Sequence, residues 1–563
     1  MRSAIFLRFR RGLARFPKPP EEPIRSELFS VERLEAHAES LAAAQKVVSG
    51  PSTGRPISRR LAQNAKVLTE TYRVIADATR DGHPLTPAAE WLLDNFHLVE
   101  EQVRQIRSDL PPRYYYELPK LAGGPLAGYP QIFGIAWAFV AHTDSRFDLQ
   151  TLVRFVNAYQ RVHPLTIGEL WAIAITLRII LVENLRRLAE AILRNREASD
   201  AADRFADRLL NAAEPNSEPL TEMLRKYDEA PLPWAFAVQL DHRLRDQDLA
   251  IEPALRWLTE RLASQGTTPD RVIQDELRLQ GALNVTVRNV ITSMRLISEI
   301  DWANFFQSVS LVDATLRDAT DFEAMDFATR DLYRRAIERL ARGSGQSELD
   351  IANQAIARAR KAAQLAPQDK LSDRERDPGY YLIARGVRAF ERELGFRLAP
   401  SEWLRRLNEM AGCAGYIFLI ELVAVFVAAG AVYALSSAGL PDLTLLWLFV
   451  LALIPASDAA IAIVDRAVTS RIGPGILPGL ELADGVPRTL RTMIAMPVLL
   501  TKPEQVEELI ERLEVHCLAN FDGDLYFALL SDWTDAETET TPDDEIILTT
   551  AINGIAACRV AIG

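Results

Sequence analysis

The stretch TIGELWAIAITLRIILVENLRRLAEAILRN, from Thr166 to Asn195, predicts a long helix, because its apolar residues recur at intervals of three and four. Thr166 and Glu169 have the spacing of a capping box, in which two side chains bond reciprocally to backbone N–H groups at the start of a helix. Four charged residues interrupt the apolar run: Arg178, Glu183, Arg186 and Arg187. Each such charge costs roughly 2.5–3.5 kcal/mol at the centre of a bilayer. We therefore expect a buried core helix rather than a membrane span.

The same helical period continues on both sides of this stretch, from about Pro23 to Leu407. Polar stretches divide the region and are typical of loops: GPSTGRPIS from Gly50, NAAEPNSEP from Asn211 and APQDKLSDRERDPG from Ala366. No fixed repeat period is visible, which argues against a helical-repeat solenoid. The prediction is a helical cytoplasmic region over residues 23–410.

Residues 1–22 form a basic arm before this region. Arginines at positions 8, 10 and 11 interrupt the apolar run that a signal peptide needs. We interpret the arm as solvated. The alternative is a helix that lies on a membrane surface.

Composition excludes several classes of function. The 563 residues are enough for three or more domains, and 64 Lys and Arg against 76 Asp and Glu give a net charge of −12. Nucleic acid is therefore not an expected partner, since phosphate binding needs clustered cations. The three cysteines and seven histidines lack the spacing of metal sites. No P-loop, nucleophile elbow or dinucleotide fingerprint occurs, so we assign no catalytic residue and no metal ligand.

Two long apolar runs follow Met410 and predict a membrane hairpin over residues 411–470. The spans lie at about 416–435 and 443–464, and each is close to the roughly 20 residues that cross a bilayer. The connector SSAGLPD holds no Lys or Arg, whereas arginines flank the pair on both outer sides. By the positive-inside rule, both large flanks are cytoplasmic.

Glu421 and Asp458 lie inside these predicted spans. Intramembrane carboxylates are candidates for a substrate path. The simpler interpretation is that each side chain, within two turns of a cytoplasmic end, reaches the interface or a neighbouring helix.

After the hairpin, TMIAMPVLL, PEQVEELIERLEVHCLAN and LYFALLSDWTDA read as strand, helix and strand. They deliver Asp532 and Asp535 to the carboxyl end of the second strand, where open α/β sheets bind ligands. A carboxylate there commonly accepts hydrogen bonds from a nucleobase or ribose. On spacing alone, a βαβ unit of unknown purpose fits equally well.

Asp522 and Asp524 form a D-x-D pattern of the kind that binds a metal–diphosphate in many sugar transferases. The pattern precedes the second strand, where Asp and Gly favour a turn. We therefore predict a turn here rather than a metal site.

Long ordered motifs resemble the amino-terminal part of bacterial cyclic β-1,2-glucan synthases. They are PIRSELFSVERLEAHAESLA, PRYYYELPKLAGGPLAGYPQIFGIAWAFVAHTDSRFD, AYQRVHPLTIGELWAIAITLRIILVENLRRLAE, MDFATRDLYRRAIERLARGSG, DPGYYLIARG and RLEVHCLANFDGDLYFALLSDWTDA. The resemblance covers nearly the whole chain.

This resemblance implies a multi-pass protein of the bacterial inner membrane that polymerises glucose from UDP-glucose with Mg²⁺ or Mn²⁺. It also implies that residues 488–563 begin an A-type glucosyltransferase domain and stop within it. Asp532, with Asp535 less securely matched, corresponds to the acidic strand end that meets the uridine. The implied fold class is mainly α, with an incomplete α/β unit after the hairpin.

Two functions stay open at this point. The chain is either an amino-terminal portion of such a synthase, inactive alone, or a non-catalytic membrane scaffold or split-enzyme subunit for a separate catalytic partner. The expected partners are the inner membrane and a carboxyl-terminal catalytic fragment or sister chain.

Overall fold

The computed structural model describes most of the chain. The described residues are 21–48, 54–110, 114–210, 227, 231–245, 252–365, 374–398, 400–436, 441–471, 477–482, 484–520, 523–536, 538 and 541–562. Nearly all of the predicted basic arm, and all or part of the three predicted loops, lie outside them. The described chain is mainly α-helical, as predicted. It divides into two compact units, Met1–Ala314 and Thr315–Gly563, whereas the predicted domain boundaries stay predictions.

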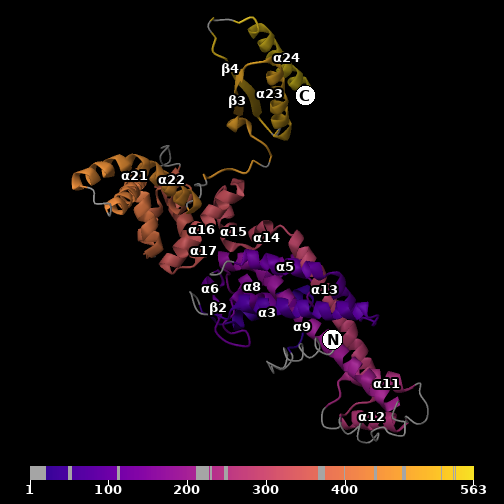
Figure 1. Ribbon diagram of the computed structural model, residues 1–563. Coiled ribbons are helices and arrows are strands. Elements are labelled where there is room, and N and C mark those ends of the chain that lie inside the picture. The colour runs from indigo at the N-terminus through magenta and orange to yellow at the C-terminus, as the bar shows by residue number, and fades with distance from the viewer. Residues whose placement is uncertain are drawn as a thin grey trace. The chain divides into compact units, whose positions relative to one another are not determined.

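In its described residues, the first unit is helical apart from one short antiparallel pair of strands (Figure 1). Its elements are α2 (Val31–Ala44), β1 (Val47–Val48), α3 (Ile57–Arg80), α4 (Pro87–Asp94), α5 (Phe96–Asp109), α6 (Tyr114–Glu117), β2 (Lys120–Leu121), α7 (Gln131–His142), α8 (Leu149–Gln160), α9 (Ile167–Leu210), α11 (Trp234–Arg245), α12 (Glu252–Ser264), α13 (Pro269–Glu299), α14 (Trp302–Val309) and α15 (Leu311–Ala319). The boundary between the units falls within α15.

Helix α9 is the centre of this unit and confirms the predicted core helix. It is 44 residues long, and its first half is buried on nearly every side because α3, α5, α7 and α13 pack around it. The predicted capping box is present: Thr166 N–H donates to Glu169 at 3.0 Å, and Glu169 N–H donates to the Thr166 hydroxyl at 3.2 Å. Its second half packs on α11, where Phe205 and Phe236 belong to a separate apolar core (Figure 1).

The second unit holds helices, two candidate membrane spans and a small α/β unit. Its elements are η3 (Phe322–Ala324), α16 (Phe327–Ser344), α17 (Glu348–Leu365), α19 (Gly379–Leu382), α20 (Val387–Glu393), α21 (Pro400–Ser436), α22 (Asp442–Arg471), η4 (Arg488–Leu490), β3 (Thr492–Leu500), α23 (Pro503–Ala519), β4 (Leu525–Trp533) and α24 (Asp544–Ile562).

Helices α21 and α22 are long and apolar enough to cross a membrane, over Gly412–Leu435 and Asp442–Ser470. Most of their residues are exposed, which distinguishes them from the buried helix α9. They pack against each other through a seam of small residues: Ala424 and Ala428 on α21, and Ala456 and Ala460 on α22. The backbone of Gly412 leaves the helical conformation, with φ 49° and ψ −139°, so a kink separates the apolar part of α21 from its polar start.

The segment that follows α22 is bound to the start of α16. Asp326 N–H donates to the Gly479 carbonyl at 3.1 Å, and Glu481 N–H donates to the Ala324 carbonyl at 2.8 Å. Arg330 adds an ion pair to Glu481 at 2.5 Å. The segment after the hairpin is therefore fastened to the helices that precede the hairpin.

Candidate functional site

The predicted strand–helix–strand is present and its two strands are parallel. β3 and β4 pair over their whole length, from Thr492 opposite Leu525 to Leu500 opposite Trp533. α23 connects them, and Figure 1 shows α23 and α24 beside the two strands. Leu500 and Val506 belong to a small core shared with both helices. Both strands consequently end at the same edge.

A shallow pocket of about 440 Å³ lies toward this carboxyl edge. Its lining residues are Pro497, Val498, Leu499, Leu530, Ser531 and Asp532. Asp532 stands opposite Leu499 in the register and is exposed. One of its carboxylate oxygens accepts a hydrogen bond from Trp533 N–H at 2.9 Å. The pocket thus combines an apolar lining with one accessible carboxylate.

Asp535 lies two residues beyond β4 and is exposed. It does not line the pocket that contains Asp532. The sequence therefore located the strand end, but the apolar lining of Pro497, Leu499 and Leu530 was missed. Alternation along paired strands could have found it, since opposite residues share a face.

The last two residues of the D-x-D pattern, Gly523 and Asp524, form part of a turn directly before β4, at the end of the strand away from the pocket. Asp524 forms an ion pair with Arg491 at 3.0 Å, and its N–H donates to the Val486 carbonyl at 2.7 Å. The hydrogen bond from Arg491 lowers the pKa of Asp524. Gly523 has φ +90°, and a Cβ atom there would lie 2.2 Å from Val486 N, so the turn requires glycine. Asp522 lies outside the described residues.

No group of three or more His, Cys, Asp or Glu residues that could hold a metal ion is found within the described ranges.

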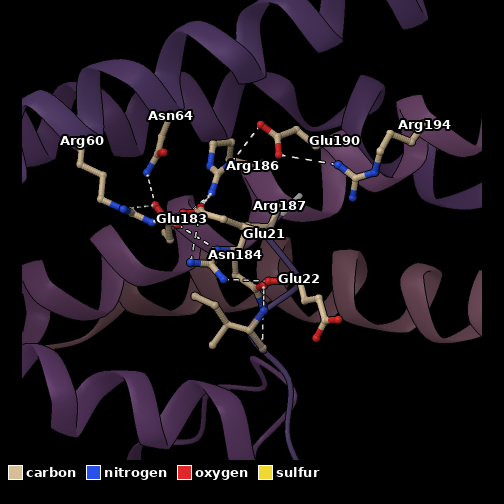
Figure 2. A network of polar contacts seen from close by, with 11 residues as sticks. Glu21, Glu22, Arg60, Asn64, Glu183, Asn184, Arg186, Arg187, Glu190 and Arg194 are labelled. Atoms are coloured by element: carbon tan, nitrogen blue, oxygen red, sulfur yellow. Dashed lines mark hydrogen bonds and ion pairs between the residues drawn. The ribbon is translucent and has the colours of Figure 1, made fainter. Parts of the chain in front are cut away.

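The other prominent charged cluster surrounds Glu183, which is 1% exposed on α9 (Figure 2). Three arginines contact its carboxylate: Arg60 at 2.5 Å, Arg186 at 3.0 Å and Arg187 at 2.9 Å. Two further carboxylates bind arginines of this set, Glu21 to Arg60 and Glu190 to Arg186. Burial alone would raise the pKa of Glu183, but the hydrogen bond from Arg60 and the three positive charges hold it well below the usual range.

Near this cluster, Asn184 binds the chain segment that precedes α2. It accepts a hydrogen bond from Ile24 N–H at 2.6 Å and donates to the Ile24 carbonyl at 3.2 Å. Figure 2 shows Glu21 and Glu22 of that segment beside the arginines of α9. The cluster therefore joins α3, α9 and this segment, and each of its three carboxylates, Glu21, Glu183 and Glu190, is paired with arginine. Because its carboxylates are all engaged by arginines that tie the elements together, we assign the cluster a structural role and not a catalytic one.

Comparison with known proteins bears on the α/β unit and on the rest of the chain. The chain is 36% identical over 555 residues to the cyclic β-(1,2)-glucan synthase NdvB of Rhizobium meliloti. The resemblance to cyclic β-1,2-glucan synthases is confirmed. The match covers 96% of this chain but only 19% of that synthase, at its amino-terminal end. No family model matches the chain. The synthase activity itself therefore belongs to a protein of which this chain spans about a fifth.

Proposed function

We propose that the chain supplies the amino-terminal part of a membrane-bound synthase that polymerises glucose from UDP-glucose into cyclic β-1,2-glucan. The observation that carries the proposal is the identity to NdvB along 96% of the chain. The parallel pair β3–β4, with a pocket at its carboxyl edge, supports a nucleotide-sugar site in the last part of the chain.

In this proposal Asp532 accepts hydrogen bonds from the uridine of the donor, while Leu499 and Leu530 pack against the base. Asp535 is a second, more distant acceptor. A Mg²⁺ or Mn²⁺ ion is expected with the diphosphate in the complete synthase. The described residues offer no cluster of ligands for it, so none of them is assigned to the metal.

The proposal also places α21 and α22 across the bacterial inner membrane, with both large flanks in the cytoplasm. Length and hydropathy support the crossing. Arginines at positions 405 and 406 precede the hairpin and those at 466 and 471 follow it, which supports the orientation.

A reconstitution experiment tests the function. Residues 1–563 are co-expressed with NdvB that lacks its matched amino-terminal 19%, in a host without β-1,2-glucan. Membranes then receive labelled UDP-glucose and Mg²⁺ or Mn²⁺. We expect cyclic β-1,2-glucan from the pair and none from either part alone.

Two matched variants distinguish a direct role of the Asp532 site in glucan synthesis from a role of the chain in assembling the synthase alone. Asp532→Ala is expected to reduce glucan formation at limiting UDP-glucose by about 10- to 100-fold, since a hydrogen bond to a charged group contributes about 1.5–3 kcal/mol. Glu511→Ala removes the same charge from an exposed position of α23 and should leave the activity unchanged. Restored activity that is insensitive to Asp532→Ala would support the scaffold function. Glucan from residues 1–563 alone would show that the active site has been misplaced.

A further inference from the structure

Asp458 lies deep within the apolar part of α22. Asp458 lies seven residues before Asp465, whose carboxylate accepts a hydrogen bond from the Tyr416 hydroxyl at one end of the apolar stretch. At 1.5 Å per residue, Asp458 is about 10 Å farther into the span. Side chains on a helix tilt toward its amino terminus, which for α22 is the direction away from that end. Asp458 therefore points deeper into the span and does not reach the nearer interface.

Glu421 on α21 provides the contrast. It lies five residues after Tyr416, about 7.5 Å into the span. The membrane interface nearest to Glu421 is at the amino-terminal end of the apolar part of α21. Helical side chains tilt toward the amino terminus, so the longer side chain of Glu421 extends toward that interface. Glu421 can thus remain hydrated, whereas Asp458 cannot.

The hairpin partner does not cover Asp458. Ala456 and Ala460 of α22 are buried in the seam with α21, and Asp458 is exposed. With 3.6 residues per turn, Asp458 lies about 160° around the helix from each of these alanines. Its carboxylate consequently faces away from α21.

Helices α21 and α22 of a second copy would not supply a partner either. No Lys, Arg or His occurs between Gly412 and Leu435 or between Asp442 and Asp465. The neighbouring Ser457 hydroxyl already donates to the Ile454 carbonyl at 2.7 Å. A carboxylate at this depth is costly to leave in lipid and is normally paired.

We propose that the outward face of α22 around Asp458 is a docking surface for a further membrane helix, other than α21 and α22, that presents a basic side chain at the same depth. The inference rests on the proposed membrane crossing of α21 and α22. The carboxylate would form an ion pair with that side chain, shielded from lipid by the two packed helices.

Synthetic membrane-spanning peptides test this surface. The purified chain is reconstituted in phosphatidylcholine vesicles with a labelled Leu-Ala peptide that carries one Lys at the depth of Asp458. A matched peptide has Leu in that position. Energy transfer between chain and peptide measures association. We expect the Lys peptide to bind the wild-type chain about tenfold more tightly than the Leu peptide.

Two matched variants assign the effect. Asp458→Leu should abolish the preference for the Lys peptide, and Glu421→Leu should retain it. Asp458→Leu removes a charge from the apolar stretch, so insertion of the hairpin should not suffer. Equal binding of the two peptides by the wild-type chain, or loss of the preference in Glu421→Leu alone, would overturn the proposal. Asp458-dependent energy transfer between two labelled copies of the chain would overturn it as well, in favour of self-association.

Alkaline carbonate extraction separates this inference from the proposed synthase function. Release of the chain from the vesicles would refute both the membrane crossing and the docking surface. It would not decide the proposed synthase function, which the reconstitution of glucan synthesis tests independently. Retention of the chain together with equal peptide binding would refute only the docking surface.

Discussion

Arg60 on α3 binds Glu183 on α9 through two hydrogen bonds, 2.9 Å from Nε to Oε2 and 2.5 Å from Nη2 to Oε1. The two residues are 123 positions apart in the chain. Asn64, one turn farther along α3, donates to Oε2 at 2.7 Å. Glu183 therefore joins two helices that no local sequence pattern connects.

Removal of this carboxylate should destabilise the first unit strongly. Glu183→Ala removes the most deeply buried carboxylate that Arg60 and Arg186 share and leaves them only the more exposed Glu21 and Glu190. We expect a loss of about 3 kcal/mol in the free energy of unfolding, at the lower end for a broken buried ion pair. Urea unfolding of the chain, followed by circular dichroism, measures it. Glu27→Ala breaks the exposed ion pair with Arg33 and should cost no more than about 1 kcal/mol. Similar costs for both variants would contradict the structural role of the cluster.

Stability that depends on Glu183 should be lost only in acid. Its folded-state pKa is held below the ordinary value of 4.5, so its contribution is fully present above about pH 4.5 and decreases as the pH falls through the folded-state pKa. Unfolding measured at stepwise lower pH should show this loss in the wild-type chain. Glu183→Gln should flatten that part of the profile.

Glu169 should produce the opposite slope near neutral pH. Burial raises its pKa to about 7, although the hydrogen bonds with Thr166 oppose the shift. The folded state therefore holds the proton more tightly, and stability is highest below pH 4.5 and declines as the pH rises to about 7. The full decline is about 3 kcal/mol for a shift of this size. Glu169→Gln keeps a capping-box acceptor and should remove the slope, and an unchanged slope would show that another group titrates.

Gly523→Ala should disrupt the turn before β4. The substitution adds a Cβ atom 2.2 Å from Val486 N at a residue with φ +90°, and we expect a cost of about 3 kcal/mol or more. Gly395→Ala is the matched control, because Gly395 has φ +66° but no atom within 4 Å of the added Cβ. Its expected cost is about 1 kcal/mol. Hydrogen exchange in β3 and β4 should rise in the first variant and not in the second.

Asp458 should dominate the cost of inserting α22 into a membrane. Replacing it with Leu is expected to lower the apparent insertion free energy of the segment by about 2.5–3.5 kcal/mol. Glu421→Leu in the α21 segment should lower it by less, since Glu421 reaches toward the interface. A glycosylation-based insertion assay measures both segments, and equal effects would contradict the difference in depth.

Local patterns were sufficient to predict the helical fold class and several elements. The period of apolar residues predicted α9, and the spacing of Thr166 and Glu169 predicted its capping box. The length of the apolar runs predicted α21 and α22, and alternating segment types predicted β3, α23 and β4. These features depend on neighbours within one or two turns, so a single sequence is enough to identify them.

The pairing of distant residues was decided only by the tertiary structure. Nothing in the sequence indicates that Arg60 meets Glu183, or that Arg491 binds Asp524 and so engages one carboxylate of the D-x-D pattern. The strand order did predict the edge that carries Asp532, but the apolar pocket lining arises from the register of two paired strands. Such contacts depend on the path of the chain through space, because a buried ion pair or a strand pairing forms only where the rest of the fold offsets the entropic cost of bringing distant residues together.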